Sequence, residues 1–188
     1  ETSADIVRAE WRRHGVNLAS DTTPVAPESF QQTPGQWFRN DLPGLNVRKL
    51  NYVTCDFKTP TKAFHSSSLQ QAAEIVKSGG LRTGVAASDG AVGIYVEGEH
   101  RMDCAMNYAT HSTVEAHPDL VITTMFELCV DRTECYGERR TVRGQWVQQE
   151  HNVFIVGVYT HLLPIARLYT KGFNGWFRIH CSVFTALH

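Results

Sequence analysis

The chain has 188 residues, of which 42% are hydrophobic and 10% aromatic, and these values are typical of an ordinary packed domain. Lysine and arginine together number 18 and aspartate and glutamate 19, so the formal net charge at pH 7 is −1. No apolar run reaches the roughly 18 residues of a membrane helix, so we expect no membrane partner. The charge balance does not favour a nucleic-acid partner either, and we expect recognition through a local site.

The five cysteines are odd in number and widely spaced, so they do not indicate a small disulfide-rich domain. They are Cys55, Cys104, Cys129, Cys135 and Cys181. No pair has the spacing of a zinc knuckle, so we expect no metal site, reduced thiols and an intracellular protein, cytoplasmic or nuclear. The chain begins at Glu1 without the apolar core of a signal peptide, so we also expect a processed end or a domain of a larger protein.

Residues 1–46 are predicted to form an N-terminal helix followed by a Pro-rich arm. Residues 2–14 fit a short helix, because Thr2 or Ser3 can cap its start and apolar side chains recur on one face. Residues 17–46 carry prolines among Thr, Ser and Gln, which indicates an irregular arm that packs on the main domain.

Residues 47–188 are predicted to form the main domain. Its segments 120–130 and 151–163 are long, β-branched and apolar, which is typical of central strands. Further strands are expected at 47–57, 62–67, 93–98, 166–170 and 176–184, and a helix at 101–112. No βαβ repeat is present, so the pattern favours an α+β fold over a doubly wound parallel sheet.

The segment 68–80, SLQQAAEIVKSGG, carries the clearest helix signal in the chain. Ser67 or Ser68 can act as the N-cap, and apolar residues recur at helical spacing on one face. Gly79 and Gly80 end the helix, because glycine adopts the left-handed conformation needed there without a Cβ clash. The helix follows directly on a short strand that ends in a histidine.

The order of elements around this helix resembles a known family. A strand ends in FHSSS, residues 64–68; after the helix come GLRTG, then GIYV, residues 93–96, and CAMNYA, residues 104–109. These segments resemble the first half of the ADP-ribosyltransferase fold in its diphtheria-toxin and poly(ADP-ribose) polymerase branch, over roughly residues 50–170. The resemblance implies a split antiparallel β-sheet core with short flanking helices, and NAD as the substrate.

The resemblance also assigns roles to individual residues. In the family a strand-end histidine, here His65, hydrogen-bonds the adenosine-side ribose of NAD. Two tyrosines, here Tyr95 and Tyr108, enclose the nicotinamide ring, and an aromatic face stacks favourably on a cationic pyridinium. The two positions after the histidine, Ser66 and Ser67, complete the expected cofactor-binding set. The family usually has glycine at the position of Ser66, so this residue departs from the pattern.

Cleavage of the nicotinamide–ribose bond passes through an oxocarbenium-like state, as glycoside cleavage does. The family usually stabilises this cation with a glutamate at the start of its fifth strand. One alignment of the segment 146–163 puts Val153 at that position, and an apolar side chain cannot do this electrostatic work. A small offset instead makes Glu150 the catalytic residue, with Gln148 two positions before it, similar to the Q-x-E pattern of other branches.

With His65, Tyr95 and Glu150 as catalytic residues, the chain is expected to be an NAD-dependent mono-ADP-ribosyltransferase. It would transfer ADP-ribose to a macromolecular acceptor, a protein or a nucleic acid, with release of nicotinamide. The alternative is a catalytically inactive module of the same fold that binds a nucleotide or a protein partner. Release of nicotinamide from NAD distinguishes the two hypotheses.

A third hypothesis stays within the fold, because RNA 2′-phosphotransferases also use a histidine-led ADP-ribosyl transfer. They need basic residues for the 2′-phosphate and the RNA strand. The arginines that could serve are Arg101, Arg139, Arg140 and Arg143. The segment GERRTVRG is more simply a solvated hairpin, so we rank this hypothesis third.

Overall fold

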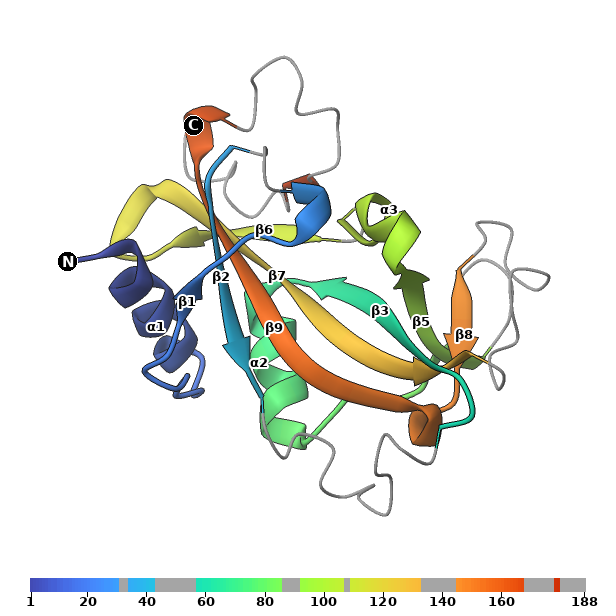
Figure 1. Cartoon of the computed structure of the whole chain (residues 1–188). Helices are drawn as coiled ribbons and strands as arrows, with labels where there is room; N and C mark the ends of the chain where they lie inside the picture. The colour runs from blue at the N-terminus through green and yellow to red at the C-terminus, as the bar shows by residue number, and fades with distance from the viewer. Residues whose placement is uncertain are drawn as a thin grey trace.

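The computed structural model describes residues 1–30, 34–42, 57–85, 92–106, 109–132, 145–167 and 178–179. Within these ranges the chain forms an open, mostly antiparallel β-sheet with a few short helices, which is an α+β architecture (Figure 1). Along the sheet the strands follow the order β1-β2-β9-β7-β3-β5-β4, while β6 pairs with β7, β8 with β5 and β10 with β6. Among the described pairs, only the one between β6 and β10 is parallel.

The described elements have the following bounds. The strands are β1 Thr23–Pro24, β2 Gln36–Asp41, β3 Pro60–Ser67, β4 Gly84–Val85, β5 Val92–Gly98, β6 Thr110–Val114, β7 His117–Asp131, β8 Trp146–Gln148, β9 Val153–Pro164 and β10 Arg178–Ile179. The helices are α1 Ser3–Arg13, α2 Leu69–Ser78 and α3 Met102–Met106, with 3-10 turns η1 Glu28–Phe30, η4 Glu99–Arg101, η6 Glu150–Asn152 and η7 Ile165–Arg167. No helix in the described ranges is long and apolar enough to cross a membrane.

Strands β7 and β9 form the centre of the sheet and pair with each other along most of their length. The register between them shifts at a bulge between Glu127 and Leu128. Both strands are rich in β-branched and aromatic residues and are buried along most of their length, as a strand covered on both faces requires. The central strands predicted over 120–130 and 151–163 are therefore confirmed.

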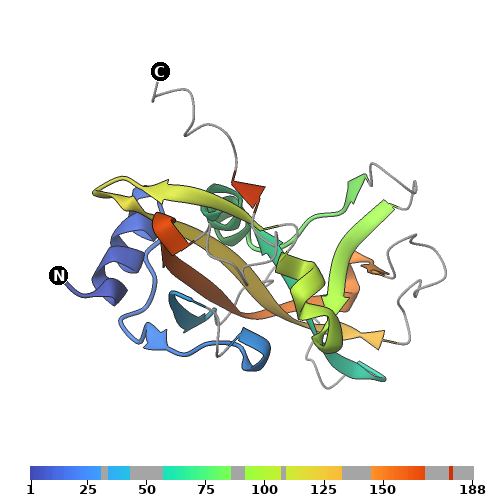
Figure 2. The same cartoon turned by 90° about the horizontal axis from the view of Figure 1, so that it is seen from above.

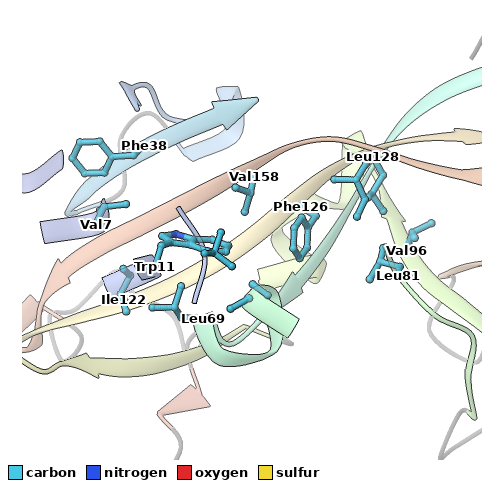
Figure 3. Packing of buried hydrophobic residues seen from close by; sticks show 14 of the residues in the cluster. Val7, Trp11, Phe38, Leu69, Leu81, Val96, Ile122, Phe126, Leu128 and Val158 are labelled. Carbon is cyan, nitrogen blue, oxygen red and sulfur yellow. The ribbon is translucent and has the colours of Figure 1, made fainter. Parts of the chain in front are cut away.

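Helices α2 and α3 lie on opposite faces of the sheet (Figure 2). Because successive side chains of a strand point to opposite faces, Phe126 of β7 joins the larger core cluster with α2, while Met125 joins the smaller cluster with α3. The larger cluster also contains Trp11 of α1 (Figure 3). The Trp11 indole N–H donates a hydrogen bond of 3.0 Å to Thr160 Oγ1 on β9, so the N-terminal helix shares the core of the central sheet.

The two helices predicted over 2–14 and 68–80 are confirmed as α1 and α2. Helix α1 begins after a capping box in which the Thr2 side chain accepts from the backbone N–H of Asp5, and the Asp5 side chain accepts from the Thr2 N–H. Helix α2 begins after Ser68 with a similar box and ends at Gly79, whose φ of 86° is left-handed. These local signals set where α2 starts and stops, and hence where it meets the sheet.

The helix predicted over 101–112 is only partly correct. Helix α3 ends at Met106, and Thr110–Val114 forms strand β6, which pairs with β7. The sequence of β6, THSTV, is rich in β-branched residues, and sheet pairing outweighs a continued helical period there. The strand predicted over 166–170 is also wrong at its start, since Ile165–Arg167 is a 3-10 turn.

The predicted irregular arm over 17–46 contains regular structure. Strand β2 pairs with β9 along its length, and β1 pairs with β2. Trp37 and Phe38 of β2 are buried in the two different core clusters on opposite faces of the sheet, which is why this segment is a strand. Of the strand predicted over 47–57, all but Phe57 lies outside the described residues.

Candidate functional site

Strands β3 and β5 separate next to His65. Strand β3 pairs with β7 along its whole length, but the described pairing of β3 with β5 consists of Ala63 opposite Gly98 and Phe64 opposite Glu97. Beyond these positions β5 pairs with β4 and β8. The sheet therefore opens at the strand position that His65 occupies.

A cleft of about 760 Å³ lies at this opening, between β3, α2 and β5. Its volume is within the range of small-molecule and cofactor sites, roughly 300–1,000 Å³. The described walls combine apolar side chains with hydroxyl, amide and charged groups. The polar and aromatic residues of these walls are His65, Ser66, Ser67, Gln70, Gln71, Glu74, Ser78, Arg82 and Tyr95.

The His65 ring bridges the two separating strands. Its Nδ1 lies 2.8 Å from the backbone oxygen of Tyr95. A carbonyl oxygen can only accept, so Nδ1 carries the proton and donates. Burial lowers the pKa of His65, and the hydrogen bond to Tyr95 opposes this effect without reversing it, so the ring is neutral at pH 7. Its other nitrogen, Nε2, is then a lone-pair acceptor.

The two serines after His65 line the cleft, and their hydroxyls also bond within the protein. Ser66 Oγ donates to Met106 Sδ at 3.7 Å. Thr124 Oγ1 donates to the Ser67 backbone oxygen at 2.9 Å, so the 3.2 Å contact between the two hydroxyls uses the proton of Ser67. Both serines are buried. Their side chains thereby fix the end of β3 just before Ser68 caps α2.

The structure brings Tyr95 next to His65. Tyr95 lies on β5 opposite Val147 of β8, is half-buried, and belongs to the wall of the cleft. Its contact with His65 is made by the backbone carbonyl, and the side chain is not part of that hydrogen bond. Tyr108, the second tyrosine expected at the nicotinamide ring, lies outside the described residues.

Glu150 begins η6, two residues after the last residue of β8, and is not part of the described wall of the cleft. Its Oε1 accepts a hydrogen bond of 2.8 Å from the backbone N–H of Thr83, the residue after the wall residue Arg82. Val153, the alternative position for the family glutamate, is 5% exposed in the larger core cluster and pairs with Val130. Of the two positions, Glu150 is therefore the one that contacts the segment at the cleft.

Sequence reasoning missed five polar residues of the cleft wall, which are Gln70, Gln71, Glu74, Ser78 and Arg82. Gln70, Gln71 and Glu74 lie on one face of α2, and the helical spacing of three to four residues after a strand-end histidine is the signal that could have indicated them. Glu74 forms an ion pair of 2.6 Å with Lys77 on the same helix. Arg82 is exposed where the chain leaves α2, and it is the only guanidinium on the described wall.

Of the four arginines that the RNA hypothesis relies on, Arg101 is the one within the described residues. Arg101 Nε lies 3.4 Å from Glu97 Oε2, and its Nη2 lies 3.6 Å from Cys104 Sγ. The remaining members, Arg139, Arg140 and Arg143, lie outside the described residues. Among the residues that are described, no three His, Cys, Asp or Glu side chains are grouped as metal ligands would be.

No protein-family model matches this sequence, and no curated protein matches it. Function is therefore inferred from the residues and geometry of the cleft.

Proposed function

We propose that the chain is an NAD-dependent mono-ADP-ribosyltransferase, built on the split antiparallel sheet of the ADP-ribosyltransferase fold. It transfers ADP-ribose to a protein or nucleic-acid acceptor and releases nicotinamide. The observation that carries the proposal is the His65–Tyr95 hydrogen bond, which joins two separating strands at a cleft of about 760 Å³. The bond leaves Nε2 of this wall residue as a neutral imidazole acceptor, and the riboses of NAD supply hydroxyls that can donate to it.

The chemical composition of the cleft wall supports a dinucleotide ligand. Gln70 and Gln71 offer amide donors and acceptors for ribose or adenine, and the apolar Ile75 and Leu81 offer surface for a base. Arg82 supplies a positive charge for the diphosphate, and guanidinium groups bind phosphate oxygens in a bidentate manner. The aromatic ring of Tyr95, with Tyr108 as its predicted partner, suits a planar cationic nicotinamide ring.

The proposed reaction breaks the bond between nicotinamide and ribose C1′. The bonding electron pair leaves on the pyridinium nitrogen, so nicotinamide departs as a neutral molecule and the ribose becomes cationic. A nucleophilic oxygen or nitrogen of the acceptor then bonds to C1′ and loses its proton to solvent. His65 holds the adenosine-side ribose, and Tyr95 holds the leaving ring and excludes water from it.

The resemblance and the geometry of the cleft differ on which carboxylate, if any, would stabilise the cationic ribose. The resemblance assigns Glu150 to stabilise the cationic ribose. In the structure Glu150 Oε1 accepts from the Thr83 N–H, and Glu150 is not on the described wall. The carboxylate that is on that wall, Glu74, is paired with Lys77. This placement favours a second candidate function, a catalytically inactive module that binds NAD or a related nucleotide.

The test is release of nicotinamide from NAD by the purified protein, together with calorimetric binding of NAD. In a His65→Asn variant the side-chain amide can still donate to the Tyr95 carbonyl, but the Nε2 acceptor is lost. We expect about a tenfold or larger loss of NAD affinity, the cost of an unmade hydrogen bond to a ribose hydroxyl. His117→Ala is the matched control, because His117 is a partly exposed histidine that pairs with Glu1.

Three outcomes separate the hypotheses. Nicotinamide release that is weakened in His65→Asn and unchanged in His117→Ala supports the transferase. Binding of NAD without release, in the presence of mixed protein and nucleic-acid acceptors, supports the inactive module. Absence of both binding and release from the folded protein contradicts both hypotheses.

A further inference from the structure

The contact between Glu150 and Thr83 fixes the backbone at the rim of the cleft. Glu150 Oε1 accepts from the Thr83 N–H at 2.8 Å, and both residues are half-buried. A hydrogen bond to a carboxylate is stronger than one between neutral groups, and partial exclusion of water strengthens it further. Arg82 directly precedes Thr83 and is exposed at the cleft. The contact thereby restricts the backbone directly after Arg82, the residue that supplies a guanidinium to the described wall.

The two ends of this contact approach β5 through different strands. Strand β8 pairs with β5 and ends at Gln148, two residues before Glu150. Strand β4 pairs with β5 through Gly84 opposite Gly93, and it begins directly after Thr83. The bond between Glu150 and Thr83 therefore links the end of β8 to the start of β4, next to the part of β5 that lines the cleft.

We infer that Glu150 is a positioning residue, whose carboxylate holds the Arg82–Thr83 backbone so that the Arg82 guanidinium faces the diphosphate of NAD. The ligand in this inference rests on the proposed function. The role differs from direct stabilisation of the cationic ribose, which needs a negative charge near C1′. Positioning needs only an oxygen that accepts from the Thr83 N–H, and a glutamine side chain supplies that oxygen without the charge.

The first measurement is the KM for NAD and the kcat for nicotinamide release in Glu150→Ala, Glu150→Gln and Arg82→Ala. We expect Glu150→Ala to raise KM about tenfold with a much smaller change in kcat, because a ground-state contact is misplaced. Glu150→Gln is expected to rescue most of this loss. The double variant Glu150→Ala/Arg82→Ala is expected to resemble Arg82→Ala alone, since both changes remove the same contact.

The second measurement needs no NAD. Hydrogen exchange of the Thr83 amide is expected to quicken about tenfold or more in Glu150→Ala and to stay slow in Glu150→Gln. Glu115→Ala is the matched control for both measurements, because Glu115 is an exposed carboxylate that pairs with Arg13. This control is expected to leave the Thr83 exchange and the KM at their wild-type values.

The outcomes separate this inference from the proposed function. A large loss of kcat in both Glu150→Ala and Glu150→Gln, with KM unchanged, means that the charge acts on the reaction and overturns the positioning role. Unchanged Thr83 exchange in Glu150→Ala overturns it as well. If wild-type protein neither binds NAD nor releases nicotinamide, the proposed function fails, and the exchange measurement alone decides whether Glu150 positions the cleft rim.

Discussion

At the scale of single residues, Tyr95 contributes its backbone and its side chain to the cleft in separate ways. The backbone carbonyl accepts from His65 Nδ1, and this contact does not depend on the side chain. Tyr95 is half-buried and belongs to the wall of the cleft. A substitution of the side chain therefore tests the ring alone, with the histidine still held in place.

We predict that Tyr95→Ala stays folded and loses about ten- to a hundredfold in kcat/KM for nicotinamide release, because the aromatic contact with the leaving ring is lost. Tyr95→Phe is expected to keep most of the activity, since it retains the aromatic face. Steady-state kinetics of both variants gives kcat/KM for nicotinamide release, and circular dichroism shows whether each variant is folded. Full activity in Tyr95→Ala contradicts the assignment of this ring to nicotinamide.

The second residue-scale feature is a pair of buried histidines on the face of the sheet that carries α3. The rings of His111 and His161 have centroids 6.4 Å apart, and His161 stacks on Trp37 at 4.3 Å. His161 Nε2 donates to the Pro34 carbonyl at 2.8 Å. Burial lowers the pKa of His111 to about 3 and that of His161 to about 4.

These shifts predict how stability depends on pH. Both histidines are neutral when folded, whereas in the unfolded chain they take up protons below their ordinary pKa of 6.5. Their contribution to the free energy of unfolding is therefore complete above pH 6.5 and decreases as the pH falls from 6.5 toward 4 and 3. Urea unfolding of the wild type at pH 7.5 and 5.0 is expected to show this loss. His111→Leu is expected to reduce it, and an equal loss in this variant contradicts the prediction.

At the scale of elements, the wall of the cleft depends on how closely β8 approaches β5. At Gly93 an added Cβ would overlap Val147 Cγ1 and lie 2.9 Å from the Gln148 backbone oxygen. Gly93 itself belongs to the cleft wall. The absence of a side chain at this position lets β8 pack against β5, and so sets where Glu150 emerges from β8.

We predict that Gly93→Ala lowers the free energy of unfolding by about 1–3 kcal/mol, the usual cost of an overpacked position. The double variant Gly93→Ala/Val147→Ala is expected to recover only part of this loss, because the overlap with the side chain is relieved while the short distance to the Gln148 carbonyl remains. Chemical denaturation gives the free energy of unfolding of both variants. A loss below about 0.5 kcal/mol in Gly93→Ala contradicts the close approach.

At the scale of the whole molecule, the parts that the sequence predicted correctly are those with local signals. Helix α2 has a cap at Ser68 and a left-handed glycine at its end, and the central strands have long β-branched runs. Strand β2 was missed because six residues rich in polar groups become a strand only through pairing with β9. The same local rules predicted a helix that extends to residue 112. Residues 110–114 form strand β6 instead, because they pair with β7.

The candidate site divides in a similar way. The resemblance assigned His65 and Tyr95 to one NAD site, and this assignment stays a prediction. The resemblance did not predict the hydrogen bond between these two residues, which are 30 positions apart, or which ring nitrogen of His65 donates it. The places of Glu74 and Arg82 on the cleft wall depend on which strand faces α2. That arrangement follows from long-range pairing of β3, β5 and β8, for which no local pattern in the sequence is specific.

The short pairing between β3 and β5 has a consequence for cooperativity. The central strands pair with one another over many positions, whereas the described backbone pairing of β5 with β3 is limited to two residue pairs. The His65–Tyr95 bond, a hydrogen bond from Gln148 Nε2 to the Asp131 carbonyl and shared core packing add to this link. We expect the peripheral block formed by β4, β5, β8 and η6 to open as a separate cooperative unit, at a lower free energy than the β7–β9 centre. Native-state hydrogen exchange in low urea measures both free energies, and equal values contradict the expectation. A ligand bound across the opening would join the two units into one.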